Sequence, residues 1–394
     1  MIKLKAEIQQ ELSNILSFWM ETTLDTKHNG FIGKMDSLGK IHTEAEKGGV
    51  LNARILWTFS AAYNHTGNIA YLEIAKRAFQ YIQTYFRDKG LGGVYWTVDY
   101  QGNPLNTRKQ IYSQAFTIYG LAEFYIAIQN EEVLEFAKEL FFLIEKYSFD
   151  SEHGGYLEAF SRDWKLLGDL RLSEKDCNDP KTMNTHLHVL EAYTTLYGVW
   201  KDPYLAKQIR GLLAVFENKI IDNATHHLKL FFDKKWFSQS NNISFGHDIE
   251  ASWLLLEAAE ALNDRNLIDK FKKIALKMAE ASTEGLQTDG SMVHEFDQIS
   301  GHYDSHREWW VEAEGMIGFL NAYQISKDKK YFKIVQGLWH FTKKYLIDTK
   351  SGEWIWGVYE DYSPMIAEDK VGFWKCPYHN ARACMEILKR VNNG

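Results

Sequence analysis

An apolar helical pattern recurs along the chain. In each copy the apolar residues stand at positions i, i+3, i+4 and i+7, which places them on one face of a helix. Five copies occupy residues 54–63, 116–125, 188–197, 253–262 and 314–323, so their last positions lie 62, 72, 65 and 61 residues apart. A polar turn and a second amphipathic stretch follow each copy, as in 69–86 and 131–147. The pattern predicts a series of helical pairs.

Glycine and aromatic residues gather in the segments between the helical pairs. These segments have the β-branched and aromatic residues of short strands, and several are followed by a turn, such as DSLG at 36–39. They occupy 29–36, 92–99, 154–160, 227–233, 290–296 and 352–361. We therefore expect a short β-hairpin between successive pairs.

The two ends of the chain complete the count of helical pairs. Residues 1–20 and 380–390 both have the pattern of a helix, which brings the total to about six pairs. Six pairs can curve until the last meets the first, and this closure buries every inner helix. We therefore predict an all-α fold, an (α/α)6 toroid or barrel of about twelve helices with short β-hairpins in the loops between repeats. The alternative is an open helical-repeat scaffold for protein binding, although its repeats usually have about 34–47 residues and need no aromatic hairpins.

Composition and charge narrow the class of protein. Only five prolines and no Ser/Gly-rich tract argue against a linker, so we expect residues 1–394 to form a single domain. The net charge of −7 disfavours nucleic acid as a partner, because phosphate binding needs clustered Lys and Arg. We expect no membrane span, since no run approaches about 20 apolar residues. The three cysteines form no CxxC motif, and with no signal peptide they indicate a cytoplasmic protein.

The start of each inner helix carries polar or aromatic side chains, although each helix then continues as apolar. In a toroid these starts converge at one end, where they would line a single pocket. The residues at these positions are Arg54, Tyr112, Asn184, His188, His247, Glu250, Trp309, Trp310, Glu312, Glu314 and His379. Aromatic residues make up 14% of the chain, and tryptophan suits the flat apolar face of a sugar ring. Position within the repeat, rather than any single motif, predicts this site.

The remaining histidines are expected to lie elsewhere. His186 is two residues from His188 and cannot share its helix face, so it should point away from the pocket. We expect the loop histidines to face the solvent or the rim of the pocket. These are His226, His227, His302 and His306.

The residue types also limit the chemistry. His247 and Glu250 supply two metal ligands one turn apart, but nothing local supplies the others that a zinc site needs. The chain has no nucleophile elbow and no phosphate-binding loop. A glycosidase needs two carboxylates across the scissile bond, and Glu250, Glu308, Glu312 and Glu314 keep that alternative open.

Imidazole dominates the predicted pocket, and it suits proton transfer because its unperturbed pKa is about 6.5. Two imidazoles that face one pocket can remove a proton from one side of a carbon and return it on the other. They can also open a sugar hemiacetal, while Arg54 would stabilise an enediolate oxygen. These groups favour an aldose epimerase or isomerase that needs no cofactor and no metal.

Five segments carry a resemblance to a known family. They are VLNARILW (50–57), KTMNTHLHVLEAY (181–193), SFGHDIEASWLL (244–255), EWWVEAE (308–314) and WKCPYHNAR (374–382). Together they make the chain resemble, over essentially its whole length, the cellobiose 2-epimerases within the N-acylglucosamine 2-epimerase superfamily. The resemblance implies an (α/α)6 barrel that interconverts glucose and mannose at the reducing end of β-1,4-linked disaccharides. It also implies ring opening, removal of the C2 proton, a cis-enediolate, and reprotonation on the other face.

The resemblance further implies roles for most residues of the predicted pocket. His247 and His379 would be the acid–base pair, and His379 would also assist ring opening. His188 would support the intermediate by a hydrogen bond. Substrate oxygens would be bound by Arg54, Tyr112 and Asn184, a histidine would be oriented by Glu250, and the sugars would be held by Trp309, Trp310 and Trp374. The expected partner is a small disaccharide, and the expected assembly is a monomer or a homodimer.

Several alternatives stay open at this point. Within the superfamily, an N-acylglucosamine 2-epimerase or a mannose-type aldose–ketose isomerase would have the same fold. The tryptophans of 308–310 and 374–379 favour the disaccharide, because a second ring needs a platform of its own. Outside the superfamily, the alternatives are a glycosidase and a scaffold without catalytic activity.

Overall fold

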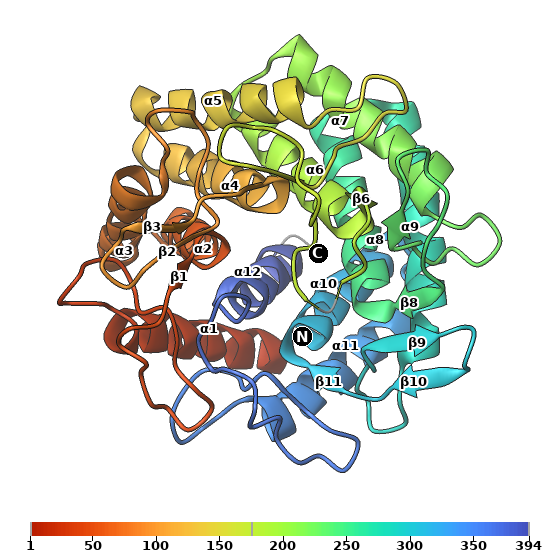
Figure 1. Cartoon of the computed structure of the whole chain (residues 1–394). Coiled ribbons are helices and arrows are strands. Elements are labelled where there is room, and N and C mark those ends of the chain that lie inside the picture. Colours follow the sequence, from red (N-terminus) through yellow and green to blue (C-terminus); the bar gives the residue numbers. More distant parts are fainter. Residues whose placement is uncertain (1, 175, 393–394) are drawn as a thin grey trace.

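The computed structural model describes residues 2–174 and 176–392, and in these ranges twelve α-helices form a closed, two-layered ring (Figure 1). The inner layer is α2 (Gly49–Thr66), α4 (Ile111–Ile128), α6 (Met183–Val199), α8 (Phe245–Ala261), α10 (Trp309–Ser326) and α12 (Tyr378–Asn392). The outer layer is α1 (Ile2–Thr22), α3 (Ile69–Tyr81), α5 (Glu131–Tyr147), α7 (Pro203–Val215), α9 (Arg265–Ser282) and α11 (Lys329–Phe341). Each inner helix contacts the next, and α12 contacts α2, so the ring closes. The predicted (α/α)6 toroid is confirmed, and the open scaffold is not the architecture.

The two layers differ in their apolar pattern because they differ in burial. In α4 every residue from Ile111 to Ala122 is buried, as expected for a helix that is covered on all sides. In α9 the buried residues Phe271, Ala275 and Met278 follow the spacing of a single apolar stripe. Five outer helices begin with an Asn or Asp that accepts a hydrogen bond from a backbone N–H two residues further on, which fixes where they start. These N-cap residues are Asn68, Asn130, Asp202, Asp264 and Asp328.

Four outer helices end in a tightened or widened last turn before the chain crosses to the next inner helix. Helices α3, α7 and α11 continue into π-helical turns, and α9 continues into a 3-10 turn. These turns are η1 (Ile82–Phe86), η2 (Phe216–Ile220), η4 (Thr342–Leu346) and η3 (Thr283–Gly285). None of the helices in the described ranges has the length and apolarity needed to cross a membrane.

Short antiparallel strands tie neighbouring repeats together at one end of the ring. The strand before an inner helix pairs with the glycine-aromatic segment of the next repeat. These pairs are β1 (Lys47–Gly48) with β2 (Thr97–Val98), β4 (Lys109–Gln110) with β5 (Ala159–Phe160), β6 (Lys181–Thr182) with β7 (Phe231–Phe232), β8 (Asn242–Ser244) with β9 (Glu295–Asp297), and β11 (Arg307–Glu308) with β12 (Gly357–Val358). A bridge between Met35 and Val371 joins the last repeat to the first.

The expected hairpins are present as well. Strand β2 pairs with β3 (Pro104–Asn106), and β9 pairs with β10 (His302–Asp304). The pairing between repeats was not anticipated from the sequence, because it joins segments about fifty residues apart. Gly93 and Gly155 hold equivalent places before two of these strands with a φ of +76°, where a Cβ would lie 2.8 Å from Trp164 and 2.4 Å from Trp236. Only glycine fits these two turns.

Candidate active site

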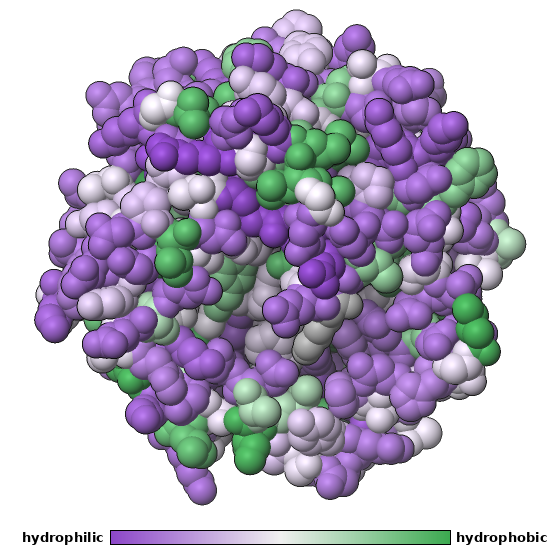
Figure 2. Space-filling model, in the orientation of Figure 1, coloured by the Kyte–Doolittle hydropathy of each residue, from purple (hydrophilic) through white to green (hydrophobic). Residues whose placement is uncertain are grey.

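The starts of the six inner helices meet around a cavity of about 500 Å³. Figure 2 shows this face of the molecule as mostly hydrophilic and hollowed at the centre of the ring. Ten residues expected in the pocket line the cavity: Arg54, Tyr112, Asn184, His188, His247, Glu250, Trp309, Trp310, Trp374 and His379. Glu312 and Glu314 do not, because Glu312 accepts from the backbone N–H of Met292 and Glu314 lies behind His379. The repeat position therefore predicted most of the residues that converge.

Two of the histidines are each backed by a buried carboxylate. Nδ1 of His188 lies 2.8 Å from Oε2 of Glu191, one turn further along α6. Nδ1 of His379 lies 2.8 Å from Oε1 of Glu314, which comes from α10. A carboxylate at Nδ1 holds the ring proton on that nitrogen, so the other ring nitrogen, Nε2, is left without a proton in the neutral ring. Each of these rings can then accept a proton at Nε2.

His247 has a different partner. Its Nδ1 lies 2.8 Å from the hydroxyl of Ser244, the residue at the N-cap position of α8. A hydroxyl can donate or accept, so it permits either tautomer of the ring, whereas a carboxylate permits one. Burial, together with His188 and His294, lowers the pKa of His247 to about 3. Burial and the cations of Arg54 and Arg382 hold the pKa of His379 well below its usual value. Both imidazoles are therefore neutral at neutral pH.

Arg382 of α12 joins the carboxylates beneath the cavity into one network. Its Nη2 donates to Oε1 of Glu250 at 2.6 Å and to Oε1 of Glu314 at 2.7 Å. Its Nη1 donates to Glu191, whose Oε1 also accepts from the hydroxyl of Tyr378 at 2.5 Å. One guanidinium thus contacts the two carboxylates that hold His188 and His379, and a third that faces the cavity.

The expectation that Glu250 orients a histidine is wrong. Nδ1 of His188, His379 and His247 is held by Glu191, Glu314 and Ser244 respectively. Oε1 of Glu250 instead accepts from Arg382. His247 turns back to the N-cap position of its helix instead of forward to Glu250. Burial and the nearby Glu314 raise the pKa of Glu250 to about 7, so this carboxyl can gain or lose a proton at neutral pH.

Arg54 and Asn184 present polar atoms to the cavity. Nη2 of Arg54 donates to the hydroxyl of Tyr112 at 2.8 Å, and the guanidinium lies 4.2 Å from the ring centroid of Phe116. Packing against this ring holds a permanent cation in a buried place. Oδ1 of Asn184 is buried and has no hydrogen-bond partner among the described residues. A buried acceptor of this kind gains from a hydroxyl that enters the cavity.

Aromatic rings form one wall of the cavity. The ring of Trp310 lies 4.7 Å from that of His247 and 5.9 Å from that of His379, between centroids. Trp374 lies 5.8 Å from Tyr112 on another side of the cavity. Trp356 also lines the cavity and lies 4.5 Å from Trp309.

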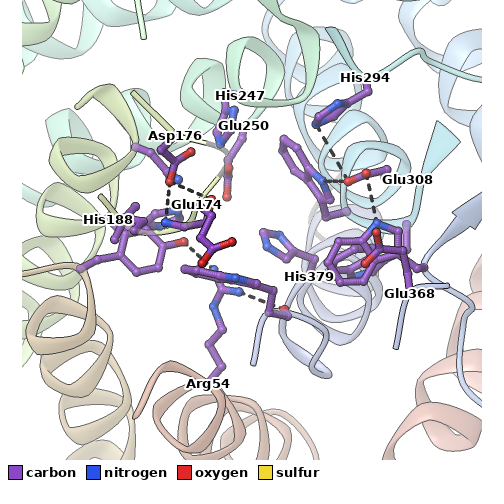
Figure 3. A pocket seen from close by; sticks show the side chains of 18 residues that line it. Arg54, Glu174, Asp176, His188, His247, Glu250, His294, Glu308, Glu368 and His379 are labelled. Carbon is purple, nitrogen blue, oxygen red and sulfur yellow. Dashed lines mark hydrogen bonds and ion pairs between the residues drawn. The ribbon is translucent and has the colours of Figure 1, made fainter. Parts of the chain in front are cut away.

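Sequence reasoning missed several lining residues. The additional side chains are Leu172, Ser173, Glu174, Asp176, His294, Glu308, Trp356 and Glu368 (Figure 3). His294 and Trp356 belong to glycine-aromatic segments that had been interpreted only as strands. Glu308 stands immediately before an inner helix, in the same place as Ser244 in the preceding repeat. That repeat position was a usable signal, whereas residues 172–176 carry no pattern that points to a pocket.

One prediction about the loop histidines is wrong. His227 is buried, and its Nδ1 lies 2.6 Å from Oδ2 of Asp248, the residue after His247 on α8. The same carboxylate accepts from the backbone N–H of Leu228 at 2.7 Å, so it anchors the whole segment to the helix. His186 points away from the cavity as predicted, since its Nε2 accepts from the backbone N–H of Tyr156 at 2.8 Å. His302 is exposed, and His226 and His306 are partly exposed, as expected.

Among the described residues, one cluster has the geometry of a metal site. Ligand atoms of Glu250, Glu314 and His379 lie within 4.8 Å of one another. Arg382 already donates to an oxygen of both carboxylates, so their charge has a partner within the protein. This donor set fits a guanidinium better than a metal ion. Independence from metals stays a prediction.

The ring of helices and the imidazole-lined cavity define a barrel protein equipped for proton transfer. The family model for N-acylglucosamine 2-epimerase (GlcNAc 2-epimerase) matches residues 30–383, so the chain belongs to this family of carbohydrate epimerases.

Individual relatives agree with the family over the full chain. A Bacteroides fragilis protein named cellobiose 2-epimerase is 48% identical over 386 residues, which is 98% of each sequence. A Dictyoglomus turgidum protein of the same name is 41% identical over 390 residues, covering 98% of this chain and 99% of the relative. The solved structure of cellobiose 2-epimerase from Bacillus thermoamylovorans B4167 is 42% identical and superposes with a TM-score of 0.94, covering 99% of this chain and all of the other.

Proposed function

We propose that this protein inverts C2 of the reducing-end glucose in β-1,4-linked disaccharides, converting cellobiose to glucosyl-mannose and lactose to epilactose. The names of its relatives and the identity over the whole chain support this substrate class. The observation that carries the proposal is the pair of neutral imidazoles of His247 and His379, which line one cavity and both pack near Trp310. Two bases in one cavity can exchange protons with both faces of a single carbon.

The reaction would begin with opening of the sugar ring. His379 would take the proton of the C1 hydroxyl at Nε2 and then, as an imidazolium, give it to the ring oxygen. The C1–O5 bond breaks as the C1 carbonyl forms, so the product is an open-chain aldehyde and His379 is neutral again. Glu314, bonded to Nδ1 of His379, would stabilise the imidazolium that forms whenever this ring takes up a proton. His188 would hydrogen-bond the oxygens of the open chain, and Glu191 would hold its ring in place.

Inversion at C2 would follow through an enediolate. One imidazole would remove the C2 proton, and the electron pair of that bond would form the C1–C2 double bond and place negative charge on O1. Arg54, a fixed cation in the cavity, would stabilise this charge. Rotation about C2–C3 would follow. The other imidazole, after taking up a proton from solvent, would protonate C2 on the other face to give the epimer, and the first would return its proton to solvent. Protonation at C1 instead would give the ketose, so a lactulose-type side product is expected.

The other parts of the proposal concern the surroundings of the reaction. Tyr112 and Asn184 would bind substrate oxygens, and Trp309, Trp310 and Trp374 would hold the sugar rings. We further propose that the ring acts as one catalytic domain, as a monomer or a homodimer, without metal or cofactor. A cytoplasmic location stays a prediction from the unpaired cysteines.

Proton NMR of lactose in D2O with EDTA-treated protein tests the proposal. We expect deuterium to enter C2 while the signals of epilactose grow. Turnover of N-acetylglucosamine or mannose without any change in lactose would instead support one of the other activities in this family. Release of free glucose would mean that carboxylates break the glycosidic bond, and no reaction with any sugar would contradict an enzymatic role.

A further inference from the structure

Glu308 is a buried carboxylate at the edge of the cavity, and both of its oxygens face indole groups. Oε2 accepts from Nε1 of Trp310 at 2.7 Å, and Oε1 accepts from Nε1 of Trp356 at 3.1 Å (Figure 3). Glu308 stands at the N-cap position of α10, yet its side chain makes no capping hydrogen bond. Polar side chains at this position usually accept from the first backbone N–H groups of the helix. Here the carboxylate binds the two indoles instead.

The two indoles lie in different parts of the site. Trp310 packs near both His247 and His379, at 4.7 and 5.9 Å between ring centroids, so its position constrains both rings. Trp356 packs on Trp309 and forms part of the cavity wall. A shift of Trp310 would therefore disturb the histidines, whereas a shift of Trp356 would disturb the surface on which a sugar rests.

A charged ring lies beside Glu308. Nε2 of His294 lies 3.9 Å from Oε2 of Glu308. Burial would lower the pKa of His294, but Glu308, Asp304 and Glu295 outweigh it and raise the pKa to about 9, so the ring is an imidazolium at neutral pH. Oε2 therefore faces this ring as well as Nε1 of Trp310, which restricts the orientation of the carboxyl group. Both indole N–H groups thus meet an acceptor that can hold them in one orientation.

We propose that Glu308 is a positioning residue that acts through Trp310 and Trp356. It holds Trp310 in its packing against the two histidines and Trp356 as a fixed wall for the sugar. This inference rests on the proposed function, in which His247 and His379 exchange protons with the substrate. Loosening Trp310 should lower kcat, because proton transfer depends on the geometry of both imidazoles. Loosening Trp356 should mainly raise KM.

A double-mutant cycle tests whether Glu308 acts through the indoles. Glu308→Gln keeps the size of the side chain but replaces one accepting oxygen with a donor. We expect kcat/KM for cellobiose to fall about 10- to 100-fold, the range of a hydrogen bond to a charged group. Trp310→Phe and Trp356→Phe keep an aromatic ring and remove the N–H. In a protein that already carries Trp310→Phe and Trp356→Phe, Glu308→Gln should lower kcat/KM for cellobiose by less than about threefold, because both indole N–H groups are already absent.

Additive losses in that cycle would overturn the proposal, and so would an unchanged kcat/KM in Glu308→Gln. Glu360→Gln, which changes an exposed carboxylate beyond β12, is the matched control and should behave as the unchanged protein. If Glu308→Gln does not fold, Glu308→Asp takes its place, since it keeps the charge but is too short to reach both indoles. The same cycle then applies.

Near-UV circular dichroism gives a second measurement that needs no turnover. The tryptophan signal should change in Glu308→Gln and stay unchanged in Glu360→Gln. An unchanged signal in Glu308→Gln would contradict the positioning role even if kcat/KM for cellobiose falls. Failure of the unchanged protein to convert cellobiose would refute the proposed function instead, so the two failures can be told apart.

Discussion

Buried charges occur in two regions of this protein, and they are arranged differently. Around the ring, a lysine before an inner helix or near the last one pairs with an aspartate that follows an outer helix. The pairs are Lys47–Asp25, Lys109–Asp88, Lys181–Asp150 and Lys370–Asp348, with Nζ–O distances of 2.7, 3.0, 2.9 and 2.5 Å. At the centre, Arg382 faces three carboxylates at once. Each outer aspartate has a lysine of its own, and Asp88 also pairs with Arg162, whereas the three central carboxylates share one cation.

The difference shows in the protonation of the acids. Burial alone would raise the pKa of Asp150, but Lys181 and the backbone N–H groups of its turn hold the pKa below its usual range. At the centre, burial and Glu314 raise the pKa of Glu250 to about 7. At neutral pH the outer acids are therefore locked as anions, and the centre can exchange a proton. The repeated lysine–aspartate pairs stabilise the fold. The central carboxylates outnumber their cation, so one of them can exchange a proton and take part in chemistry.

Removing the central cation should have the largest effect. Arg382→Met leaves three buried carboxylates without their shared partner, so we expect the free energy of unfolding to fall by about 3–5 kcal/mol. Some of the acids must then become protonated, and His188 and His379 lose their anionic partners. We expect kcat for cellobiose to fall about 10²- to 10⁴-fold as well. Denaturant unfolding and initial rates measure the two losses, and Arg382→Lys should recover part of both. A rate near that of the unchanged protein would contradict the central role of this network.

Removing either acid–base histidine should separate activity from stability. His247→Ala and His379→Ala should each lower kcat about 10²- to 10⁴-fold, because each change deletes one proton carrier. Both rings line a cavity and carry no charge at neutral pH, so the melting temperature should change little. Rates and thermal unfolding on the same samples check this expectation. Near-normal turnover in either variant would remove that histidine from the mechanism.

Breaking an outer pair should give the opposite result. Lys181→Met leaves Asp150 buried without its cation, and we expect the free energy of unfolding to fall by about 3–5 kcal/mol with little change in kcat. Adding Asp150→Asn should restore part of the loss, because both charges are then gone. A fall in kcat at unchanged stability would break the distinction between the two regions.

The pH dependence of the free energy of unfolding tests whether Asp150 causes the loss of stability in Lys181→Met. Lys181 lowers the folded-state pKa of Asp150, so the stability from this pair is present above the unfolded pKa of about 3.9. It is lost as the pH falls through the lower, folded-state value. The difference in unfolding free energy between the unchanged protein and Lys181→Met should therefore be largest at pH 7 and should decrease below about pH 4. A difference that stays constant down to pH 3 would mean that Asp150 is not its source.

The sequence predicted a residue's place in the fold wherever that place follows from the residue's position within a repeat. The helix starts recur, so the convergence of Arg54, His247 and His379 could be predicted without knowing any distance. Glu191, Glu314 and Arg382 lie further along their helices, where the pattern is that of apolar core. Their meeting across the barrel depends on the angles between helices, and no local pattern reports those.

The hydrogen-bond partners of the histidines could not be predicted from the sequence either. The resemblance implied that Glu250 would orient a histidine, and His247 is a candidate because residues three apart share a helix face. His247 stands at the third residue of α8, however, where the N-cap hydroxyl of Ser244 is equally close in sequence. His227 looked like a loop residue because its partner Asp248 is 21 positions away. One-turn spacing predicts that two residues can meet, and the competition between partners is decided by tertiary structure.

The smallest expected effect lies at an uncharged residue of the cavity. Oδ1 of Asn184 has no hydrogen-bond partner in the described part of the chain, so its removal costs the free protein nothing in hydrogen bonding. Asn184→Ala should raise KM for cellobiose about 2- to 10-fold, the worth of one neutral hydrogen bond, and leave kcat within about twofold. Initial rates over a range of cellobiose concentrations separate the two constants. An unchanged KM would remove Asn184 from substrate binding. A large fall in kcat would instead place this neutral amide among the groups that stabilise the enediolate, and polar catalysis would then extend beyond the charged centre.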